Sequence, residues 1–319
     1  HELLKGVNTV YFKGDPDVEI SGITYDSRKA KKGDLFICVS GFKYDGHSFI
    51  DDALGKGAVA FITEKDAEVP GAAVVKVESS RTAMPVIASN FYGNPSQKLR
   101  LIGITGTNGK TTTTYLIKSI MEANKQKIGL LGTITTQIGD KIYISSRTTP
   151  EALDLQCLFR EMADSDVDYA VMEVSSHSLE LGRVEGCNFR IGVFTNLTQD
   201  HLDFHKTIEN YRNAKKKLFY MVDGTNIINI DDEHGKIIAG ELKNTGVRLI
   251  TYGIDNKADI TAKNIDITSN GVGFTIVTPE YEAELNIRIP GKFSVYNALA
   301  AAAAAYAEGI DRNIIREGL

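Results

Sequence analysis

The chain has 319 residues, of which 42% are hydrophobic and 24% charged, the composition of an ordinary globular protein. This length allows two domains with at least one large core, and no apolar run approaches the roughly 20 residues that span a bilayer, which argues against membrane insertion. The net charge of −5 argues against nucleic-acid binding and requires any polyanionic ligand to be held by local positive charge. No signal-peptide pattern opens the chain, and Cys38, Cys157 and Cys187 have no metal-ligand spacing, so we expect a cytoplasmic protein with reduced thiols.

A region of short strands comes first in chain order and predicts a small α/β domain. Apolar runs bounded by turn-forming residues predict strands at Glu19–Thr24, Leu35–Val39, Ala58–Ile62 and Ala73–Val77. Helical periodicity follows from Arg81 to Phe91, and Gly93-Asn94-Pro95 ends it. We therefore place a domain boundary after residue 95.

From residue 96 to 319 the pattern changes to strand, glycine turn and helix. Strands are predicted at Leu99–Ile104, Ile128–Leu131, Tyr169–Val174, Ile191–Thr195, Asn226–Ile230 and Leu249–Tyr252. Helices are predicted at Thr112–Ala123, Pro150–Met162, Thr207–Met221 and Ser294–Ala307. Between residues 260 and 289 the period becomes two, with a hairpin signal at Asn270-Gly271. The expected fold class is α/β, with a P-loop-type, mostly parallel sheet flanked by helices and an added antiparallel β portion.

A glycine-rich segment, Gly103–Thr112 (GITGTNGKTT), lies between the first of these strands and its helix, which is the setting of a phosphate-binding loop. Glycines allow backbone N–H groups to turn toward phosphate oxygens, and a helix N-terminus adds partial positive charge. In such a loop Lys110 reaches the β and γ phosphates and Thr111 binds Mg²⁺. The strict pattern is not met, because Ile104 stands where its first glycine belongs. The loop by itself indicates a nucleotide and no particular reaction.

Two polar clusters follow later strands, at the strand ends where open α/β sheets bind ligands. Glu173 ends an apolar strand and is placed to hold a metal, or its water, near the phosphates. The second cluster, Thr195–His205, contains two histidines and two aspartates and predicts a metal or phosphate site, with helix capping by Asp200 as the alternative. The sequence does not distinguish His201 from His205.

A run of three lysines, Lys215, Lys216 and Lys217, lies on a predicted helix. Tyr211 and Leu218–Phe219 mark an apolar stripe on that helix, and Lys215 is about one turn from each end of the stripe. Lys216 and Lys217 are expected on an ordinary solvated face.

Taken together, these segments resemble the Mur ligase family. The motifs that carry the resemblance are GITGTNGKTTT, Thr148–Glu151 (TTPE), MEVSSHSLELGR, NLTQDHLDFH, AKKKLF and Phe293–Asn297 (FSVYN). The resemblance covers essentially the whole chain in order and is closest to the branch that adds the third amino acid to a UDP-N-acetylmuramoyl dipeptide. Tyr25–Arg28 and Gly33–Phe36 are similar to the uridine-binding domain of that branch.

The resemblance implies a role for each matching residue. ATP would be bound by Gly106, Thr107, Asn108, Gly109, Lys110, Thr111, Thr112 and Asn297. Mg²⁺ would be held by Thr111, Glu173, His201 and Lys215, and the implied catalytic set is Lys110, Glu173, His201 and Lys215. In the family CO₂ converts the matching lysine to a carbamate, so burial should lower the pKa of Lys215 to give a neutral amine. Positions that hold the UDP-N-acetylmuramoyl peptide match Ser27, Thr148, Thr149, Ser175 and Arg183.

The family also implies a reaction and a domain plan. ATP would activate UDP-MurNAc-L-Ala-D-Glu as an acyl phosphate, which an amino acid, lysine or diaminopimelate, would attack. Residues 1–95 would bind the UDP-sugar and residues 96–319 would form the central ATPase domain of a monomer. We expect the family's C-terminal domain, which binds the amino acid, to be absent, so that this chain alone is inactive. A sister ligase of the folylpolyglutamate synthetase type, a P-loop kinase and an inactive nucleotide-binding module stay open as alternatives.

Overall fold

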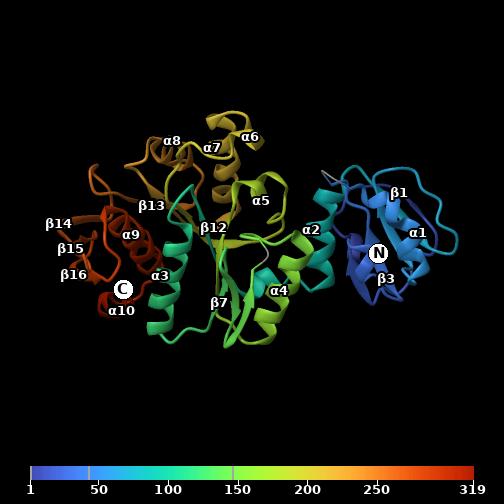
Figure 1. Cartoon of the computed structure of the whole chain (residues 1–319), viewed down its shortest axis with the longest axis horizontal. Coiled ribbons are helices and arrows are strands. Elements are labelled where there is room, and N and C mark those ends of the chain that lie inside the picture. The colour runs from blue at the N-terminus through green and yellow to red at the C-terminus, as the bar shows by residue number, and fades with distance from the viewer. Residues whose placement is uncertain (1, 42–43, 146) are drawn as a thin grey trace. The chain divides into compact units, whose positions relative to one another are not determined.

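The computed structural model describes residues 2–41, 44–145 and 147–319, and no helix in these ranges is long and apolar enough to cross a membrane. The chain forms two compact units (Figure 1). The first contains His1–Pro95, Glu151–Arg160 and Leu181–Gly186, and the second contains Ser96–Pro150, Glu161–Glu180 and Cys187–Leu319. No break in the sequence pattern marks the two later segments of the first unit.

The first unit is built on a five-stranded sheet in the order β1-β5-β4-β3-β2. Its strands are β1 (Thr9–Lys13), β2 (Gly22–Thr24), β3 (Asp34–Ile37), β4 (Ala60–Thr63) and β5 (Ala73–Val77). Strands β2 to β5 pair in parallel, whereas β1 joins β5 antiparallel. The helices are α1 (Ile50–Gly55) and α2 (Ser80–Phe91), with 3₁₀ turns η1 (Glu2–Leu4), η2 (Ser27–Lys29) and η3 (Gly46–Phe49); η4 (Pro95–Lys98) follows α2.

The central strands of this sheet bury both of their faces, because successive side chains point to opposite sides. Leu35 and Ile62 pack into the cluster that contains α2, whereas Phe36 and Phe61 pack into the cluster that contains Ala53 of α1. All four predicted strands are present within three residues of the expected bounds. Strand β1 was missed because its residues are exposed or half-buried throughout, so it has no apolar alternation to detect.

The second unit has an eight-stranded sheet in the order β13-β12-β11-β6-β10-β7-β8-β9. The strands are β6 (Arg100–Thr105), β7 (Ile128–Leu131), β8 (Thr135–Ile138), β9 (Lys141–Ile144), β10 (Tyr169–Glu173), β11 (Phe189–Phe194), β12 (Val222–Asn229) and β13 (Arg248–Tyr252). The helices are α3 (Lys110–Ala123), α4 (Ala152–Asp164, which runs from one unit into the other), α5 (Ser176–Glu180), α6 (Leu202–His205), α7 (Ile208–Lys216), η5 (Lys217–Met221), α8 (Glu233–Leu242), α9 (Lys292–Ala307) and α10 (Arg312–Gly318). All pairs are parallel except β7–β8 and β8–β9, which are antiparallel.

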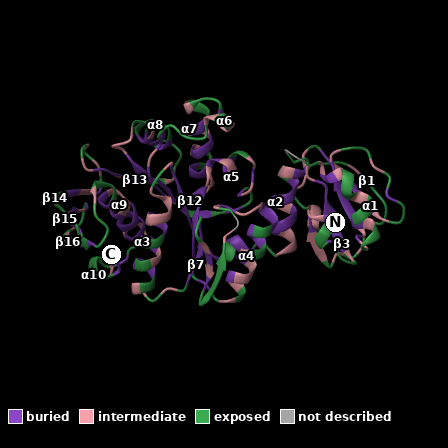
Figure 2. Ribbon diagram, in the orientation of Figure 1, coloured by how far each residue is buried: buried purple, intermediate pink, exposed green. Residues whose placement is uncertain are grey.

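Helix α9 joins this sheet to a second, antiparallel sheet, β14 (Thr261–Thr268), β15 (Gly271–Val277) and β16 (Glu282–Ile287). Every residue from 298 to 305 is at most 1% exposed, in one cluster with α3 and both sheets. A helix that is apolar on all sides must be covered on all sides, and its alanines allow close packing (Figure 2). The predicted hairpin at Asn270-Gly271 is confirmed, since Thr268 pairs with Gly271.

The predicted fold class is confirmed, and the differences are local. The predicted helix Thr207–Met221 divides into α7 and the 3₁₀ turn η5. Helix α3 begins at Lys110, two residues before the predicted Thr112. The β8–β9 hairpin was missed because all four residues of β9 are exposed.

Candidate functional site

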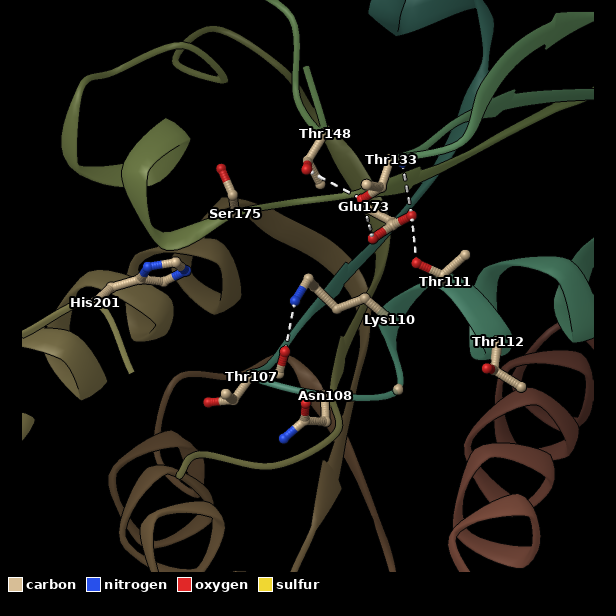
Figure 3. A pocket seen from close by; sticks show the side chains of 11 residues that line it. Thr107, Asn108, Lys110, Thr111, Thr112, Thr133, Thr148, Glu173, Ser175 and His201 are labelled. Carbon is tan, nitrogen blue, oxygen red and sulfur yellow. Dashed lines mark hydrogen bonds between the residues drawn. The ribbon is translucent and has the colours of Figure 1, made fainter. Parts of the chain in front are cut away.

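A polar pocket of about 280 Å³ lies where the glycine-rich loop meets the ends of neighbouring strands (Figure 3). Its lining is Thr107, Asn108, Gly109, Lys110, Thr111, Thr112, Thr133, Thr148, Glu173, Ser175 and His201. The loop follows β6, and Glu173 ends the adjacent strand β10, because the carboxyl ends of parallel strands share one sheet edge. Most residues predicted for the nucleotide and the metal therefore lie together.

Two glycines of the loop are required by its geometry. Gly106 and Gly109 have φ of 151° and 85°, which side chains rarely adopt. A Cβ at Gly106 would lie 1.9 Å from Thr195 Oγ1, and one at Gly109 would lie 2.4 Å from Asn297 Oδ1. Ile104, by contrast, is a buried residue of β6, so the departure from the strict motif falls in the strand and leaves the loop unchanged.

The loop is held from behind by the segment that follows β11. Thr107 N–H donates to the carbonyl of Asn196 (2.8 Å), and Asn108 N–H donates to the Asn196 side chain (3.0 Å). The Thr195 hydroxyl donates to the Asn108 carbonyl (2.7 Å). Sequence reasoning gave Asn196 no role, although its position at a strand end next to β6 was a usable signal.

Two lysines converge on one carbonyl of the loop. Lys110 Nζ donates to Gly106 O and Thr107 O (2.8 and 2.9 Å), and Lys215 Nζ donates to Gly106 O (2.8 Å). Lys215 is 1% exposed and lies 4.4 Å from the centroid of the Tyr211 ring. Burial, and then the charge of Lys110, hold the pKa of Lys215 well below its ordinary value. Burial also lowers the pKa of Lys110.

Glu173 is 1% exposed, and uncharged donors surround its carboxylate. It accepts hydrogen bonds from the Thr111 hydroxyl (2.9 Å), from Thr133 N–H (2.9 Å) and from the Thr133 hydroxyl (3.1 Å). It forms no salt bridge with another described residue, and a side chain at Gly132 would lie 2.7 Å from Glu173 Oε1. Thr133 was missed, although it follows β7, the strand next to β10.

The structure separates the two histidines that the sequence could not. His201 lines the pocket, is 46% exposed in its side chain and lies 3.5 Å from Asp200. His205 is 5% exposed, and its Nε2 lies 2.9 Å from the hydroxyl of Ser176. Burial lowers the pKa of His205, so this histidine is a core residue outside the pocket.

The predicted peptide-binding residues fall into three places. Thr148 and Ser175 line the pocket, and the Thr148 hydroxyl lies 3.0 Å from that of Thr133. Thr149 is 1% exposed and donates to the Glu173 carbonyl (2.9 Å), so it supports the strand end from behind. Ser27 and Arg183 belong to the first unit, where Arg183 forms an ion pair of 2.9 Å with Glu151.

The residues present fit a hard divalent cation. The Thr111 hydroxyl and the Glu173 carboxylate are adjacent oxygen donors, the type that Mg²⁺ prefers, and no cationic side chain among the described residues forms a salt bridge with this buried carboxylate. In the described ranges no three His, Cys, Asp or Glu side chains are grouped to hold a metal. Beyond Thr111 and Glu173, the remaining ligands of a bound Mg²⁺ would therefore include water and phosphate oxygens.

Fold and site together define an α/β protein of the phosphate-loop class, with a glycine-rich loop between a central parallel strand and a helix N-terminus. The Mur ligase middle domain matches residues 104–305, and the Mur ligase family catalytic domain matches residues 19–92. The chain belongs to the Mur ligase family, which confirms the resemblance of its motifs.

Within the family, several similar proteins carry the same name. The UDP-N-acetylmuramoyl-L-alanyl-D-glutamate--2,6-diaminopimelate ligases of Clostridioides difficile (strain 630) and Alkaliphilus metalliredigens (strain QYMF) are 50% and 51% identical over 319 residues. Each match covers 100% of this chain, and 66% and 65% of the relatives. A solved structure of a ligase of the same name matches with a TM-score of 0.83 at 30% identity, covering 93% of this chain and 62% of that one. The chain thus spans about two thirds of the length of the relatives that it matches.

Proposed function

We propose that this chain is the ATP-binding and sugar-nucleotide-binding part of a ligase that joins 2,6-diaminopimelate to UDP-MurNAc-L-Ala-D-Glu. The observation that carries the proposal is the buried Lys215 beside the phosphate loop, because binding a nucleotide does not by itself require a second lysine with a lowered pKa. The names of the relatives supply the substrates, and favour diaminopimelate over lysine. The same names favour this reaction over a folylpolyglutamate synthetase or a kinase.

ATP would bind with its phosphates along the loop and the N-terminus of α3. The backbone of Gly106–Gly109 would face the phosphates, and Lys110 would exchange its two carbonyl partners for phosphate oxygens. Thr111 and Glu173 would hold Mg²⁺ on one side of the pocket, with His201 and modified Lys215 completing the set. When bound, the metal would offset the negative charge of the triphosphate and the attacking carboxylate.

Lys215 has the environment that carbamate formation needs. The neutral amine attacks the carbon of CO₂, an N–C bond forms, and one proton leaves to solvent, which gives a carboxylate-like anion on the side chain. Neutrality is favoured here because a charged Lys215 would be buried beside the charged Lys110, with both ammonium groups on one carbonyl. The resulting anion would supply an anionic oxygen donor in addition to that of Glu173.

The proposed reaction has two steps. The terminal carboxylate of the dipeptide attacks the γ-phosphorus of ATP, an O–P bond forms, and ADP leaves. The amine of diaminopimelate then attacks the acyl carbon, and phosphate leaves with the C–O bonding pair. This chain's residues would align and neutralise two anions that otherwise repel each other. Thr148 and Ser175 line the pocket and would contact the muramyl peptide, as would Thr149 and Arg183, whereas Ser27 would contact the uridine diphosphate.

The decisive experiment is a product assay on the protein that contains these 319 residues. ADP release should require UDP-MurNAc-L-Ala-D-Glu, and hydroxylamine should trap the activated dipeptide as a hydroxamate when diaminopimelate is omitted. A stable phosphorylated acceptor that does not react with amines would identify a kinase instead. With the chain itself, ¹³C-bicarbonate should give a carbamate NMR signal that Lys215→Arg removes.

A positioning role for Thr133 follows from its two hydrogen bonds to Glu173. Thr133→Val keeps the shape and the N–H bond but removes the hydroxyl donor, so we expect kcat to fall roughly 10- to 100-fold, as for a lost hydrogen bond to a charged group. The Mg²⁺ concentration for half-maximal rate should rise as well. Thr135→Val is the matched control, because Thr135 lies two residues away at the start of β8 and its hydroxyl contacts Tyr115 OH of α3 (3.0 Å). Equal losses in both variants would indicate damage to the hairpin and refute the role of Thr133.

The burial of Lys215 should also lower the free energy of unfolding of the unmodified chain. Its pKa is lower in the folded than in the unfolded chain, so the unfolded chain binds more protons between the two pKa values, and stability rises with pH in that window. Lys215→Met should therefore raise the Tm by a few degrees at pH 7 in bicarbonate-free buffer, and the gain should shrink as pH approaches the ordinary lysine value of 10.5. A Tm that is lower than that of the wild type at pH 7 would contradict this account of the burial.

A further inference from the structure

A second pocket lies in the same unit, away from the candidate site. It is bounded by α8, the residue after β12 and the edge strand β13, and its volume is about 490 Å³. Pockets for small molecules have volumes of roughly 300–1,000 Å³. It shares no lining residue with the pocket at the phosphate loop.

The floor of this pocket is a stretch of α8 that carries only small side chains. Lys236 lies on α8 and Lys243 is the residue that caps its C-terminus in helical conformation, so the two are seven residues apart and lie on the same side. Ala239 and Gly240 lie between them and line the pocket. A Cβ placed on Gly240 would meet no heavy atom within 4 Å, so the space above the helix is open. Leu249 adds an apolar wall.

The rim of the pocket is positively charged. Lys257 joins Lys236 and Lys243 in the lining, and none of the three has a hydrogen bond or ion pair from its side chain to another described residue. The one acidic lining residue, Asp259, is engaged by Thr251, whose N–H and hydroxyl donate to its carboxylate at 2.8 and 2.6 Å. In a chain of net charge −5, three unpaired lysines around one concavity form a local positive site.

We propose that this pocket binds a small phosphorylated organic molecule. The phosphate would lie among the three ammonium groups, which bind phosphate as point charges. The organic part would lie on Gly240, where the space around a Cβ is open, and against the lining residues Ala239 and Leu249. The site is separate from the phosphate loop and from the substrates of the ligation reaction.

The test is an NMR titration of the ¹⁵N-labelled 319-residue chain with phenyl phosphate, and with inorganic phosphate for comparison. Amide shifts are expected at residues 236–243 and 257–259, with a Kd below about 1 mM for phenyl phosphate and weaker binding of phosphate. The triple variant K236A/K243A/K257A should weaken binding at least tenfold. The matched variant K5A/K98A/K127A removes three exposed lysines elsewhere and should change the Kd less than about twofold.

A variant that leaves the charge unchanged tests whether the ligand occupies the pocket or only binds to a positively charged surface. Gly240→Leu places a side chain in the open space on an exposed helix position, so it should remove the preference for phenyl phosphate over phosphate without unfolding the chain. Equal weakening by the two triple variants, or no shifts at residues 236–259, would overturn the proposal. Shifts at residues 106–112 report on the phosphate loop separately, so failure of one site leaves the other tested.

Discussion

Lys215→Ala is expected to lower kcat about 10³-fold or more while nucleotide binding changes only slightly, in the protein that contains these 319 residues. The alanine cannot carry a carbamate, so the oxygen donor proposed at this position is lost. Lys110 and the loop backbone, which are proposed to bind the phosphates, remain. Turnover and ADP affinity, measured side by side, separate these two effects.

Chemical rescue makes this prediction specific. Truncation at Lys215 leaves a cavity beside Gly106 O, and a short carboxylate such as formate or acetate should enter it and restore part of the rate. Lys217→Ala is the matched control, because Lys217 lies two residues away, is 49% exposed and pairs with Glu180 at the surface. Full activity of the Lys215→Ala variant would end the assignment of a carbamate to this position.

Glu173→Gln is expected to lower kcat by about 10²- to 10³-fold and to raise the Mg²⁺ requirement. The change keeps the shape but removes the negative charge, and it points an amide NH₂ toward a group of donors. Thr111 and Thr133 donate three hydrogen bonds to this carboxylate, and a glutamine has one oxygen to accept them.

The control for this variant is Glu209→Gln, the same chemical change in a side chain that is 71% exposed. It should leave the rate and the Mg²⁺ dependence unchanged within about twofold. If Glu173→Gln kept the wild-type rate, Glu173 would not be a metal ligand, and the phosphate loop alone would define the site.

The parts of the site that the sequence predicted are those that depend on local order. Lys110 and Thr111 follow a strand and begin a helix, and Glu173 ends a strand, so one rule about strand ends brings them together. The burial of Lys215 depends on which side of its helix faces the core. The buried side of α7 carries Tyr211, Ala214 and Lys215, whereas Lys217 lies beyond the end of that helix and is exposed.

The parts that were missed depend on contacts across the sheet. Thr133 and Asn196 are short polar residues in turns, and only the pairing of β7 with β10 and of β11 with β6 brings them to the loop. The reverse error concerns Thr149, which lies in the expected segment but is buried with its hydroxyl on a carbonyl. A motif match places a segment, whereas the direction of each side chain depends on tertiary packing.

Helix α3 is fixed at both ends by partners distant in sequence. Near its start, Asn297 of α9 lies against Gly109 and accepts from Thr113 (3.4 Å); near its end, a Cβ on Gly318 of α10 would lie 2.5 Å from Ile120 Cα. The N-terminal end of α3, where the phosphates are proposed to bind, is thus packed against a helix that two sheets enclose. We therefore expect that a residue larger than alanine at position 301, which is fully buried in α9, would lower nucleotide affinity by displacing the N-terminal end of α3.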